Sequence, residues 1–481
     1  MTQQTATSAP GTFASAPFRL LSGGQLLATP TTLTVLDPAT EQAVAQAPDC
    51  PPELLDATVA AAQAAFPAWA AQPFAERAAC LLALAKSIEG ETDALARLLT
   101  AEQGRPIAMA RQEVLSCVHW CRQVARMELP VAAHTDAMNI QWETRRVPLG
   151  VVAAIAPWNF PLLLAVMKLA PALLAGNTVI VKPSPFTPLA TLRLGELAAA
   201  LFPAGVLNVL SGGDALGPQL TAHAGIAKVS FTGSTATGRR VMAAAAPTLK
   251  RLTLELGGND AAIVLPDVDV QKVAKKLFMG AFLNAGQVCI AAKRIYVHER
   301  IYDAFAQAFA AIASAARVGP GADERSLIGP VQNRPQYERV RDLIEATRAA
   351  GHRFIAGGEL PSGPGYFIPP TVVDNPPDDA RVVTEEPFGP IVPLLRYADI
   401  DEAVHRANAS EYGLGASVWS QDVAQARAIA ARLEVGTVWI NTIHALSPNA
   451  PFAGRKQSGL GVENGLEGLL EFSAPQTLAI S

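Results

Sequence analysis

The chain has 481 residues, of which 50% are hydrophobic and 17% are charged. This composition predicts a folded globular protein with a large core, divided into two or three domains, and it excludes a disordered chain. The formal net charge is -4 at pH 7, and no basic run with interleaved aromatic residues occurs. We therefore expect small molecules or copies of the chain itself as partners, and neither nucleic acid nor a membrane.

The first residues and the cysteines bear on the cellular compartment. Residues 1–17 are small and polar, without the basic and apolar regions of an export signal, so we expect a flexible lead-in. The cysteines form no CxxC or Cys/His ligand pattern, which predicts free thiols in a reducing cytoplasm and no metal site. They are Cys50, Cys80, Cys117, Cys121 and Cys289.

The most apolar stretch, residues 147–167, reads VPLGVVAAIAPWNFPLLLAVM. Its length is close to that of a membrane span. Pro148, Pro157 and Pro161 divide it into a strand, a turn and the start of a helix. We therefore expect this stretch in the core of the protein.

The remaining elements follow two patterns in chain order. Apolar residues at three- and four-residue spacing predict helices over residues 53–103. Short apolar runs then alternate with helical segments, as in GVVAAIAP, NTVIVKPS, KVSFTGS and LTLELGG, which is typical of an α/β fold with a doubly wound, mostly parallel sheet. A second series, from RIYVH to GTVWIN, predicts a second α/β domain. Residues 126–148 predict a hairpin outside the first sheet, and the tail LLEFSAPQTLAI offers another strand.

Two strand ends carry groups that suit a bound phosphate or ribose. FTGSTATG places Gly233 and Ser234 between a strand and a helix, where backbone N–H groups and the helix dipole favour an anion. VKPS places Lys182 at the carboxyl end of a strand, where open α/β sheets bind ligands. Taken singly, these features are as compatible with an ordinary turn and a solvated lysine.

Three further residues suit covalent catalysis. Glu255 ends an apolar strand, where burial would raise its pKa towards that of a general base, whereas a strand-end glutamate facing water would have no such role. Cys289 ends the turn NAGQVC, where a partly exposed, electropositive setting would give a thiolate nucleophile, although single cysteines are more often inert. Asn159, in APWNFP, offers an amide donor to an oxyanion.

Together these motifs resemble the aldehyde dehydrogenase superfamily. APWNFP, VKPS, FTGSTATG, LELGGND, GQVC, EEPFGP and PFAGRKQSG occur in the family's order, from roughly residue 20 to the C-terminus. The resemblance implies a Rossmann-like cofactor domain, a second α/β catalytic domain and a small β oligomerisation segment. The implied limits are 1–125 and 149–256 for the cofactor domain, 257–447 for the catalytic domain, 126–148 and 467–481 for the oligomerisation segments, and 448–466 for a return to the cofactor domain.

The resemblance implies oxidation of an aldehyde to a carboxylate. Cys289 would attack the carbonyl, and the Asn159 amide and the Cys289 backbone N–H would hold the thiohemiacetal oxyanion. Glu255 would activate the water that hydrolyses the thioester, so hydrolysis is favoured over transfer to coenzyme A. Lys182 completes the predicted catalytic set. Homodimers or homotetramers are the family's usual assemblies.

The resemblance also assigns a cofactor site, with Lys182 and Glu386 at the riboses. The predicted set is Ile155, Trp158, Lys182, Ser184, Gly213, Gly233, Ser234, Leu256, Glu386 and Phe388. Pro185 stands where strictly NAD-dependent members often carry a glutamate that accepts hydrogen bonds from the adenosine ribose. Without that carboxylate a 2′-phosphate meets no repulsion, so NADP stays open. NAD is favoured because it is the more frequent cofactor in the family.

The predicted substrate tunnel is apolar and is lined by Phe160, Leu163, Met167, Val288, Ile290 and Leu446. It has no arginine for a substrate carboxylate and one aromatic ring, which disfavours semialdehydes of dicarboxylic acids and quaternary ammonium substrates. We expect an unbranched medium-chain aliphatic aldehyde or a simple aromatic one. The alternatives are a semialdehyde dehydrogenase of the same superfamily, a catalytically silent relative, and a non-redox cysteine hydrolase, which requires a histidine beside Cys289, with His298 and His444 as candidates.

Overall fold

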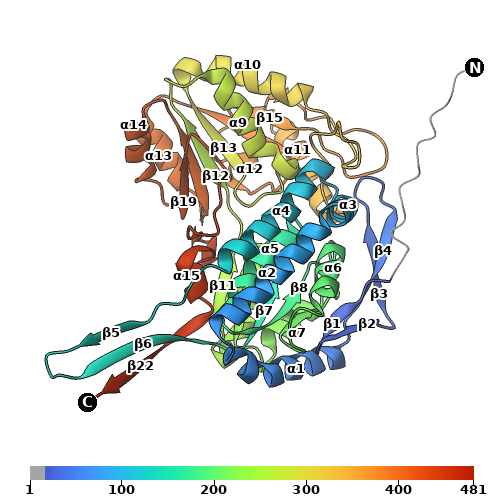
Figure 1. Cartoon of the computed structure of the whole chain (residues 1–481). Helices are drawn as coiled ribbons and strands as arrows, with labels where there is room; N and C mark the ends of the chain where they lie inside the picture. Colours follow the sequence, from blue (N-terminus) through green and yellow to red (C-terminus); the bar gives the residue numbers. More distant parts are fainter. Residues whose placement is uncertain (1–16) are drawn as a thin grey trace, which may run out of the picture.

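The computed structural model describes residues 17–481. The expected lead-in at residues 1–17 therefore lies, apart from Pro17, outside the described residues. The described chain forms two lobes, each built on a mostly parallel sheet, and a three-stranded arm that extends from one lobe and carries the C-terminus (Figure 1). This is the α/β fold class that the sequence predicts.

The first lobe contains an eight-stranded sheet in the order β2-β1-β9-β8-β7-β10-β11-β21. Its five central strands, β9 to β11 in that order, are mutually parallel, and β1 and β21 pair antiparallel with them at the two sides. The strands are β1 Leu20–Ser22, β2 Gln25–Leu27, β7 Val151–Ile155, β8 Thr178–Lys182, β9 Leu207–Val209, β10 Lys228–Thr232, β11 Arg251–Glu255 and β21 Gly459–Leu460, and a separate hairpin joins β3 Thr32–Leu36 to β4 Ala43–Pro48.

Helices cover this sheet and connect its parallel strands. They are α1 Pro52–Ala70, α2 Phe74–Gly90, α3 Thr92–Gln103, α4 Ile107–Val124, α5 Pro161–Leu174, α6 Leu189–Ala198, α7 Leu216–Ala222, α8 Thr235–Ala245 and α15 Gly465–Leu470, with a 3-10 turn η1 at Ala246–Thr248. The apolar stretch at 147–167 forms β7, a turn and the start of α5, as predicted. Because α5 is buried along nearly its whole length, it needs apolar residues on every side.

The second lobe contains a seven-stranded sheet in the order β14-β15-β16-β13-β12-β18-β19, parallel except for β14. Separate apolar clusters pack on its two faces. The strands are β12 Asp260–Val264, β13 Ala292–His298, β14 Phe354–Ala356, β15 Thr371–Asp374, β16 Ile391–Tyr397, β18 Gly415–Trp419 and β19 Thr437–Ile440, and a short ladder pairs β17 Tyr412–Gly413 with β20 Arg455–Lys456. The helices are α9 Val270–Phe282, η2 Leu283–Gly286, α10 Glu299–Ala315, α11 Arg334–Ala349, α12 Arg381–Thr384, α13 Ile400–Asn408 and α14 Val423–Ala430.

The arm consists of β5 (Ala132–Thr135), β6 (Gln141–Pro148) and β22 (Ser473–Ile480). Strand β22 pairs antiparallel with β6 from Ser473 opposite Pro148 to Ile480 opposite Gln141. The predicted hairpin and the predicted tail strand therefore belong to one sheet that lies outside both lobes (Figure 1).

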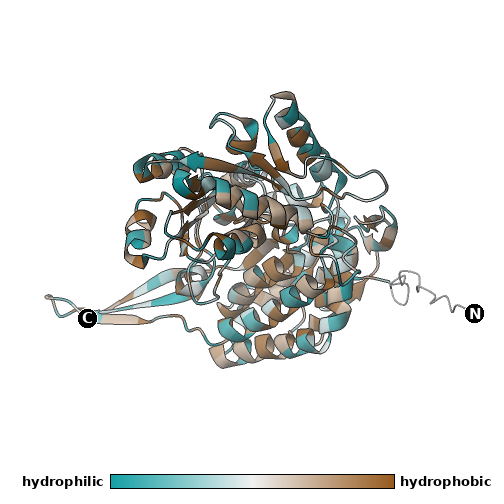
Figure 2. Cartoon of the chain, turned by 90° about the horizontal axis from the view of Figure 1, so that it is seen from above, coloured by the Kyte–Doolittle hydropathy of each residue, from teal (hydrophilic) through white to brown (hydrophobic). Residues whose placement is uncertain are grey.

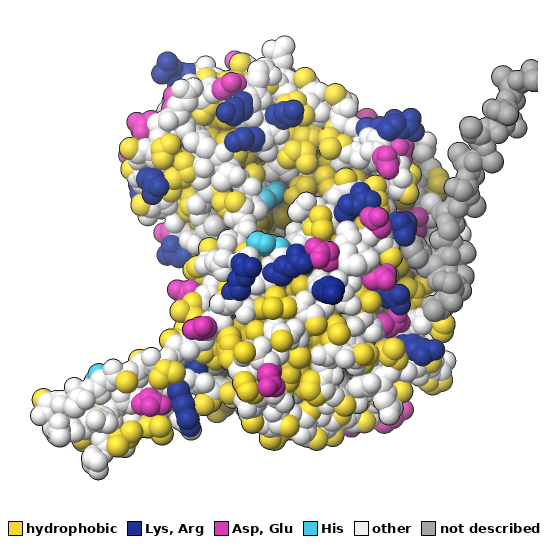
Figure 3. Space-filling model, in the orientation of Figure 1, with side chains coloured by type: hydrophobic (Ala, Val, Ile, Leu, Met, Phe, Trp, Pro, Cys, Tyr) yellow, Lys and Arg dark blue, Asp and Glu magenta, His cyan; other side chains and the backbone are white. Residues whose placement is uncertain are grey.

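Hydropathy and charge follow this architecture. Helices show a hydrophobic side towards the interior and a hydrophilic side outwards (Figure 2). The face in Figure 3 carries charges of both signs, with a small group of Lys and Arg side chains on each lobe. Among residues 17–481, no helix combines the length and apolarity that crossing a bilayer requires.

The second sheet lies between residues 260 and 440, and β21 returns to the first sheet. The predicted domain limits at 257, 447 and 466 stay predictions.

Candidate active site

Four parallel strands of the first lobe bring predicted residues to one edge of the sheet. The register sets Ile155 beside Lys182, and Thr232 beside Glu255. The carboxyl ends of parallel strands meet at one edge, and open α/β sheets bind ligands there. Lys182 and Glu255 therefore face the same region, although they are distant in sequence.

Glu255 is buried at the end of β11, with 5% of its surface exposed. Neither carboxylate oxygen has a hydrogen-bond partner among the described residues. Burial raises its pKa from the ordinary 4.5 to about 8; the charge of Glu463 also raises it, and Lys168 lowers it. A buried carboxylate with free oxygens and a pKa near neutrality suits a general base. The alternative of a glutamate facing water is wrong.

The loop before Cys289 has an unusual backbone. Asn284, Ala285 and Gly286 take left-handed conformations in succession, with φ of 52°, 55° and 72°. A Cβ at Gly286 would lie 2.3 Å from the carbonyl oxygen of Gly389, so this position requires glycine. The loop thereby turns sharply between α9 and β13 and presents Cys289 between the lobes.

Gln287 fixes this loop from inside the protein. Its amide oxygen accepts a hydrogen bond from Gln332 N at 2.8 Å, and its amide nitrogen donates to Asn284 O at 2.8 Å. Gln287 is fully buried, so these bonds are shielded from competing water. The strained backbone before the cysteine is thus held by the side chain of Gln287.

The Cys289 thiol is half-buried and lies beside Glu255. Burial raises its pKa well above the ordinary value of 9.0, and Glu255 raises it further, whereas Lys293 acts in the opposite direction. Glu255 and Lys293 thus act on the thiol in opposite directions, and the predicted electropositive setting stays a prediction. The resting thiol keeps its proton at neutral pH, and Glu255 is the adjacent group that can accept it.

Asn159 lies in the turn between β7 and α5, against the Cys289 loop. Its side-chain amide donates to Gln287 O at 3.0 Å, and its carbonyl accepts a hydrogen bond from Asn284 Nδ2 at 3.1 Å. The backbone N–H of Cys289 has no hydrogen-bond partner among residues 17–481. An amide side chain and a free backbone N–H therefore flank the cysteine, as an oxyanion site requires.

The strand edge of the first lobe fits a dinucleotide. Lys182 is buried, which lowers its pKa to about 8. Its ammonium donates to Pro183 O at 3.1 Å, so two of its N–H groups remain for a ligand. Thr232 Oγ1 is buried without a partner in the described chain. These unused groups fit ribose hydroxyls, and the alternative of a solvated lysine is wrong.

The N-terminus of α8 adjoins these groups. Ser234 caps the helix by accepting a hydrogen bond from Thr237 N at 3.3 Å. Gly233 N donates to Glu255 O at 3.1 Å, which ties this turn to the end of β11. The first-turn N–H groups of a helix lack intrahelical partners and favour an anion such as a pyrophosphate.

The other predicted cofactor residues lie in three places. Ser184 and Gly213 lie near Lys182. Ser184 Oγ accepts a hydrogen bond from Phe186 N, and Gly213 N donates one to Asp49 Oδ1. Leu256 continues β11, with its N–H bonded to Ser458 O. Phe388 lies edge-on to Trp158, with ring centroids 5.2 Å apart and perpendicular planes.

Glu386 lies beside Phe388 in the second lobe. One carboxylate oxygen, Oε1, accepts hydrogen bonds from Lys293 Nζ at 2.9 Å and from Gly258 N at 3.1 Å. Its other oxygen, Oε2, has no hydrogen bond from the described residues. Glu386 thus presents a fixed, partly unused carboxylate from the lobe opposite Lys182.

The predicted tunnel residues fall into two groups. Val288 and Ile290 belong to an apolar cluster against which Phe160, Cys289 and Leu446 pack. Leu163 and Met167 lie on α5 within the core of the first lobe, and Leu446 contacts both clusters. The structure therefore places four predicted tunnel residues around the cysteine and leaves Leu163 and Met167 on the adjoining helix.

Comparisons with known proteins agree with this geometry. The model of the aldehyde dehydrogenase family matches residues 27–478. The chain belongs to the aldehyde dehydrogenase family. It is 46% identical to a putative aldehyde dehydrogenase, FUS7, of Gibberella fujikuroi, covering 87% of this chain and 89% of the relative. It is 41% identical to the phenylacetaldehyde dehydrogenase of Pseudomonas fluorescens, covering 97% of this chain and 96% of the relative.

Solved aldehyde dehydrogenases share the whole fold. The NAD+ complex of the Bacillus cereus enzyme superposes with a TM-score of 0.95 at 35% identity, covering 98% of this chain and 97% of the other. An E. coli NADP-dependent enzyme superposes with a TM-score of 0.93 at 35% identity, covering 97% of this chain and 98% of the other. The protein is an NAD(P)-dependent aldehyde dehydrogenase.

The histidines do not provide the base that a cysteine hydrolase needs. His444 contacts Ile290 O at 3.1 Å, and burial lowers its pKa to about 4. His298 accepts from Arg300 N. Within the described chain, neither forms a hydrogen bond with the Cys289 thiol, and the base beside it is Glu255.

Two buried cation–anion pairs near the site were not predicted from the sequence. Lys168 of α5 pairs with Glu463 behind Glu255, and Arg105 pairs with Glu113. Arg105 also donates to the carbonyl of Asn159. Lys168 is the single charge in the otherwise apolar helix PLLLAVMKLAPALL, and that contrast is the signal that could have identified it. Arg105 lies in an ordinary loop sequence that carries no such signal.

Proposed function

We propose that this aldehyde dehydrogenase oxidises unbranched medium-chain aliphatic or simple aromatic aldehydes to carboxylates. The observation that carries the proposal is the apolar cluster of Val288, Ile290 and their neighbours, against which Cys289 packs. Such a surface binds an apolar chain or ring by removing its surface from water. The relative named phenylacetaldehyde dehydrogenase supports an aromatic substrate.

A semialdehyde of a dicarboxylic acid fits this site less well. Arg105 is a cation beside the predicted tunnel: its guanidinium lies 4.4 Å from the centre of the Phe160 ring. Its charge is already paired with Glu113, and it also binds the Asn159 carbonyl. A substrate carboxylate would have to displace these buried contacts, which costs more than it returns.

In the proposed reaction, Glu255 accepts the proton of the Cys289 thiol, directly or through water, and the sulfur forms a bond to the aldehyde carbon. The Asn159 amide and the Cys289 N–H then stabilise the oxyanion of the thiohemiacetal. When bound, NAD or NADP supplies the hydride acceptor. Loss of the hydride leaves the thioester, and Glu255 passes its proton to solvent. Glu255 then takes a proton from the water that attacks the thioester, the C–S bond breaks, and proton transfer between the products gives the carboxylate and the thiol.

For the cofactor, we propose that Lys182 and Glu386 bind the riboses from opposite lobes. Ser234 and Gly233 suit the pyrophosphate, Trp158 and Phe388 the nicotinamide end, and Ile155, Ser184, Gly213 and Leu256 the walls of the site. NAD is the favoured cofactor, and Pro185 leaves space and neutral charge for a 2′-phosphate. We further propose that residues 126–148 and 467–481 join subunits in a homodimer or homotetramer.

Absorbance of the reduced cofactor tests the proposed substrate class. Purified protein is assayed with NAD or NADP and a panel of hexanal, octanal, benzaldehyde, succinic semialdehyde and betaine aldehyde. We expect higher kcat/KM for the first three aldehydes and no turnover by Cys289→Ala, because that variant lacks the nucleophile. A clearly higher kcat/KM for succinic semialdehyde or betaine aldehyde would contradict the substrate class.

A further inference from the structure

Lys293, four residues after Cys289, is a buried lysine that the proposed reaction does not use. Its side chain is 2% exposed. Its ammonium donates to three acceptors: Gly258 O at 2.6 Å, Glu386 Oε1 at 2.9 Å and the backbone carbonyl of Cys289. An ammonium has three N–H donors, so every donor is used and its position is fixed.

These three contacts join three parts of the active site. Gly258 lies in the loop after β11, which carries Glu255. Cys289 ends the nucleophile loop, and Glu386 is the carboxylate proposed for the cofactor ribose. The Lys293 ammonium also lies 5.9 Å from the centre of the Phe388 ring, on the side proposed for the nicotinamide. A single cation therefore contacts both the nucleophile loop and the cofactor side.

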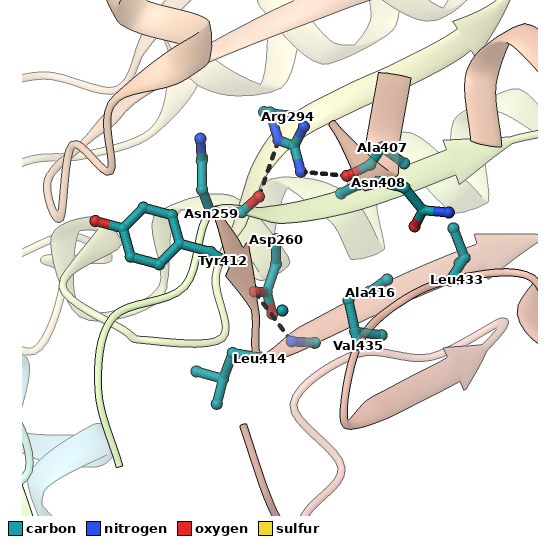
Figure 4. A pocket seen from close by; sticks show the side chains of 13 residues that line it. Asn259, Asp260, Arg294, Ala407, Asn408, Tyr412, Leu414, Ala416, Leu433 and Val435 are labelled. Atoms are coloured by element: carbon teal, nitrogen blue, oxygen red, sulfur yellow. Dashed lines mark hydrogen bonds between the residues drawn. The ribbon is translucent and has the colours of Figure 1, made fainter. Parts of the chain in front are cut away.

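The strand that carries Lys293 is held rigidly. The neighbouring residue, Arg294, donates to Asn259 O and to Ala407 O at 2.9 Å each (Figure 4). The cavity behind these residues measures about 10 Å³, room for one water at most. The strand is therefore fixed in place at the residue next to Lys293.

The charges around Lys293 explain how it acts on the thiol. The charges of Glu255 and Asp260 raise the pKa of the Cys289 thiol, and the charge of Lys293, whose ammonium is bonded to the Cys289 carbonyl, lowers it. The groups around Lys293 are Glu386, Asp260, His444 and the thiol itself. Burial raises the pKa of Asp260 to about 7, so Asp260 is only partly ionised at neutral pH. Glu386 is therefore the main anionic partner of Lys293.

We propose that Lys293 is a positioning residue that anchors the cofactor carboxylate Glu386 to the nucleophile loop and supplies the positive charge facing the Cys289 thiol. This inference rests on the proposed roles of Cys289 and Glu386. Because Lys293 and Gly258 N both occupy Glu386 Oε1, the other oxygen stays aimed at a ribose hydroxyl. Cofactor binding at Glu386 and the reactivity of the Cys289 thiol are thereby coupled through the Lys293 ammonium.

Alkylation of Cys289 by iodoacetamide tests the electrostatic role without aldehyde or cofactor. The rate is followed between pH 6 and 10 by the mass of the Cys289 peptide, which separates it from the other cysteines. We expect Lys293→Met to react about tenfold more slowly at pH 8, the change for one pKa unit. Glu386→Gln is expected to react as fast as the wild type or faster, because it removes the anion that neutralises Lys293.

Cofactor binding tests the positioning role. Equilibrium dialysis with NAD and NADP should show Kd values raised at least fivefold in both Lys293→Met and Glu386→Gln, on the order of one lost hydrogen bond to a charged group. Lys293→Arg keeps the charge, so its alkylation profile should stay near that of the wild type. Lys275→Met, at an exposed lysine of α9, is the matched control and should change neither quantity.

Several results would overturn the inference. It is wrong if Lys293→Met matches the control in its alkylation profile or in cofactor Kd. If Lys293→Met does not fold, a slower alkylation in Glu386→Gln is equally decisive against it, because the sign is then reversed. If the wild type oxidises none of the aldehydes tested, only the proposed substrate class is refuted. The alkylation rate of Cys289 tests the role of Lys293 independently, because it needs neither aldehyde nor cofactor.

Discussion

Burial moves the pKa values of two residues of this site, Glu255 and Lys182, towards neutral pH from opposite directions. It raises the pKa of Glu255 to about 8 and lowers that of Lys182 to about 8. The cause is the same for both residues, because a low-dielectric environment disfavours whichever form carries charge. A general base and a ligand-binding lysine thus gain suitable properties from where the backbone places them, with no special side-chain chemistry.

The pKa of Glu255 predicts the pH dependence of hydrolysis. A base must be deprotonated, so kcat should fall as pH drops below about 8. Glu255→Gln should lose this ionisation and give at most a single burst of reduced cofactor, which stopped-flow absorbance would show. Sustained turnover by the variant at more than about a tenth of the wild-type rate would contradict the assignment, since general-base catalysis contributes about a hundredfold or more.

The same residue predicts a stability difference of defined sign. The folded pKa of Glu255 is raised, so its contribution is full below the ordinary value of 4.5 and is lost as pH rises through about 8. The melting temperature of Glu255→Gln should therefore rise relative to the wild type between pH 5 and 8. Equal differences at both pH values would indicate that the carboxyl group is not desolvated.

At the scale of elements, the turn between α9 and β13 is the segment whose conformation matters most. Three successive left-handed residues precede Gln287, and the side chains of Gln287 and Asn284 hold this shape. Strained backbone persists only where its surroundings determine it fully. The carbonyl of Gly389 at the edge of the EEPFGP motif supplies the close contact that excludes a side chain at Gly286.

Gly286→Ala tests that contact. Its Cβ would meet Gly389 O, so we expect a fall in melting temperature together with a loss of kcat on the order of tenfold or more, because the cysteine moves. Gly351→Ala is the matched control: its φ is 78°, also left-handed, but no atom lies within 4 Å of the added Cβ. The control should lose only about 1 kcal/mol and keep its activity. Equal effects of the two substitutions would show that conformation alone, rather than the contact, is responsible.

At the scale of the whole molecule, the arm is exposed far beyond what a monomer would favour. From Pro475 onwards β22 is exposed along both faces, and no strand of the described chain pairs with its outer edge. Exposed strand edges with apolar residues pair readily with other chains. The exposed edge of β22 in the arm is therefore a surface that suits pairing with a second copy of the chain.

Charges placed on β22 test this assembly. Leu478 and Ile480 are 37% and 48% exposed, and replacing both by aspartate should reduce the mass measured by analytical ultracentrifugation to that of a smaller species. Leu82→Asp, at an exposed leucine of α2 outside the arm, should leave the mass unchanged. A monomeric wild type, or an unchanged mass in the double variant, would refute the role of the arm.

The sequence by itself predicted the fold class and the parallel strands, because buried strands need apolar runs. Its resemblance to the aldehyde dehydrogenase superfamily named Cys289, Glu255, Asn159 and Lys182 as a set, whereas each residue taken singly left an alternative open. It also predicted the hairpin and tail strand, although not that they form one sheet.

Only the tertiary structure decided the protonation of the thiol and the roles of Lys168, Arg105 and Lys293. Their function depends on which charges lie beside them, and those neighbours come from segments distant in the chain: Lys168 meets Glu463, and Lys293 meets Glu386. Burial and charge pairing depend on the position of each group in space, and spacing along one chain does not encode them.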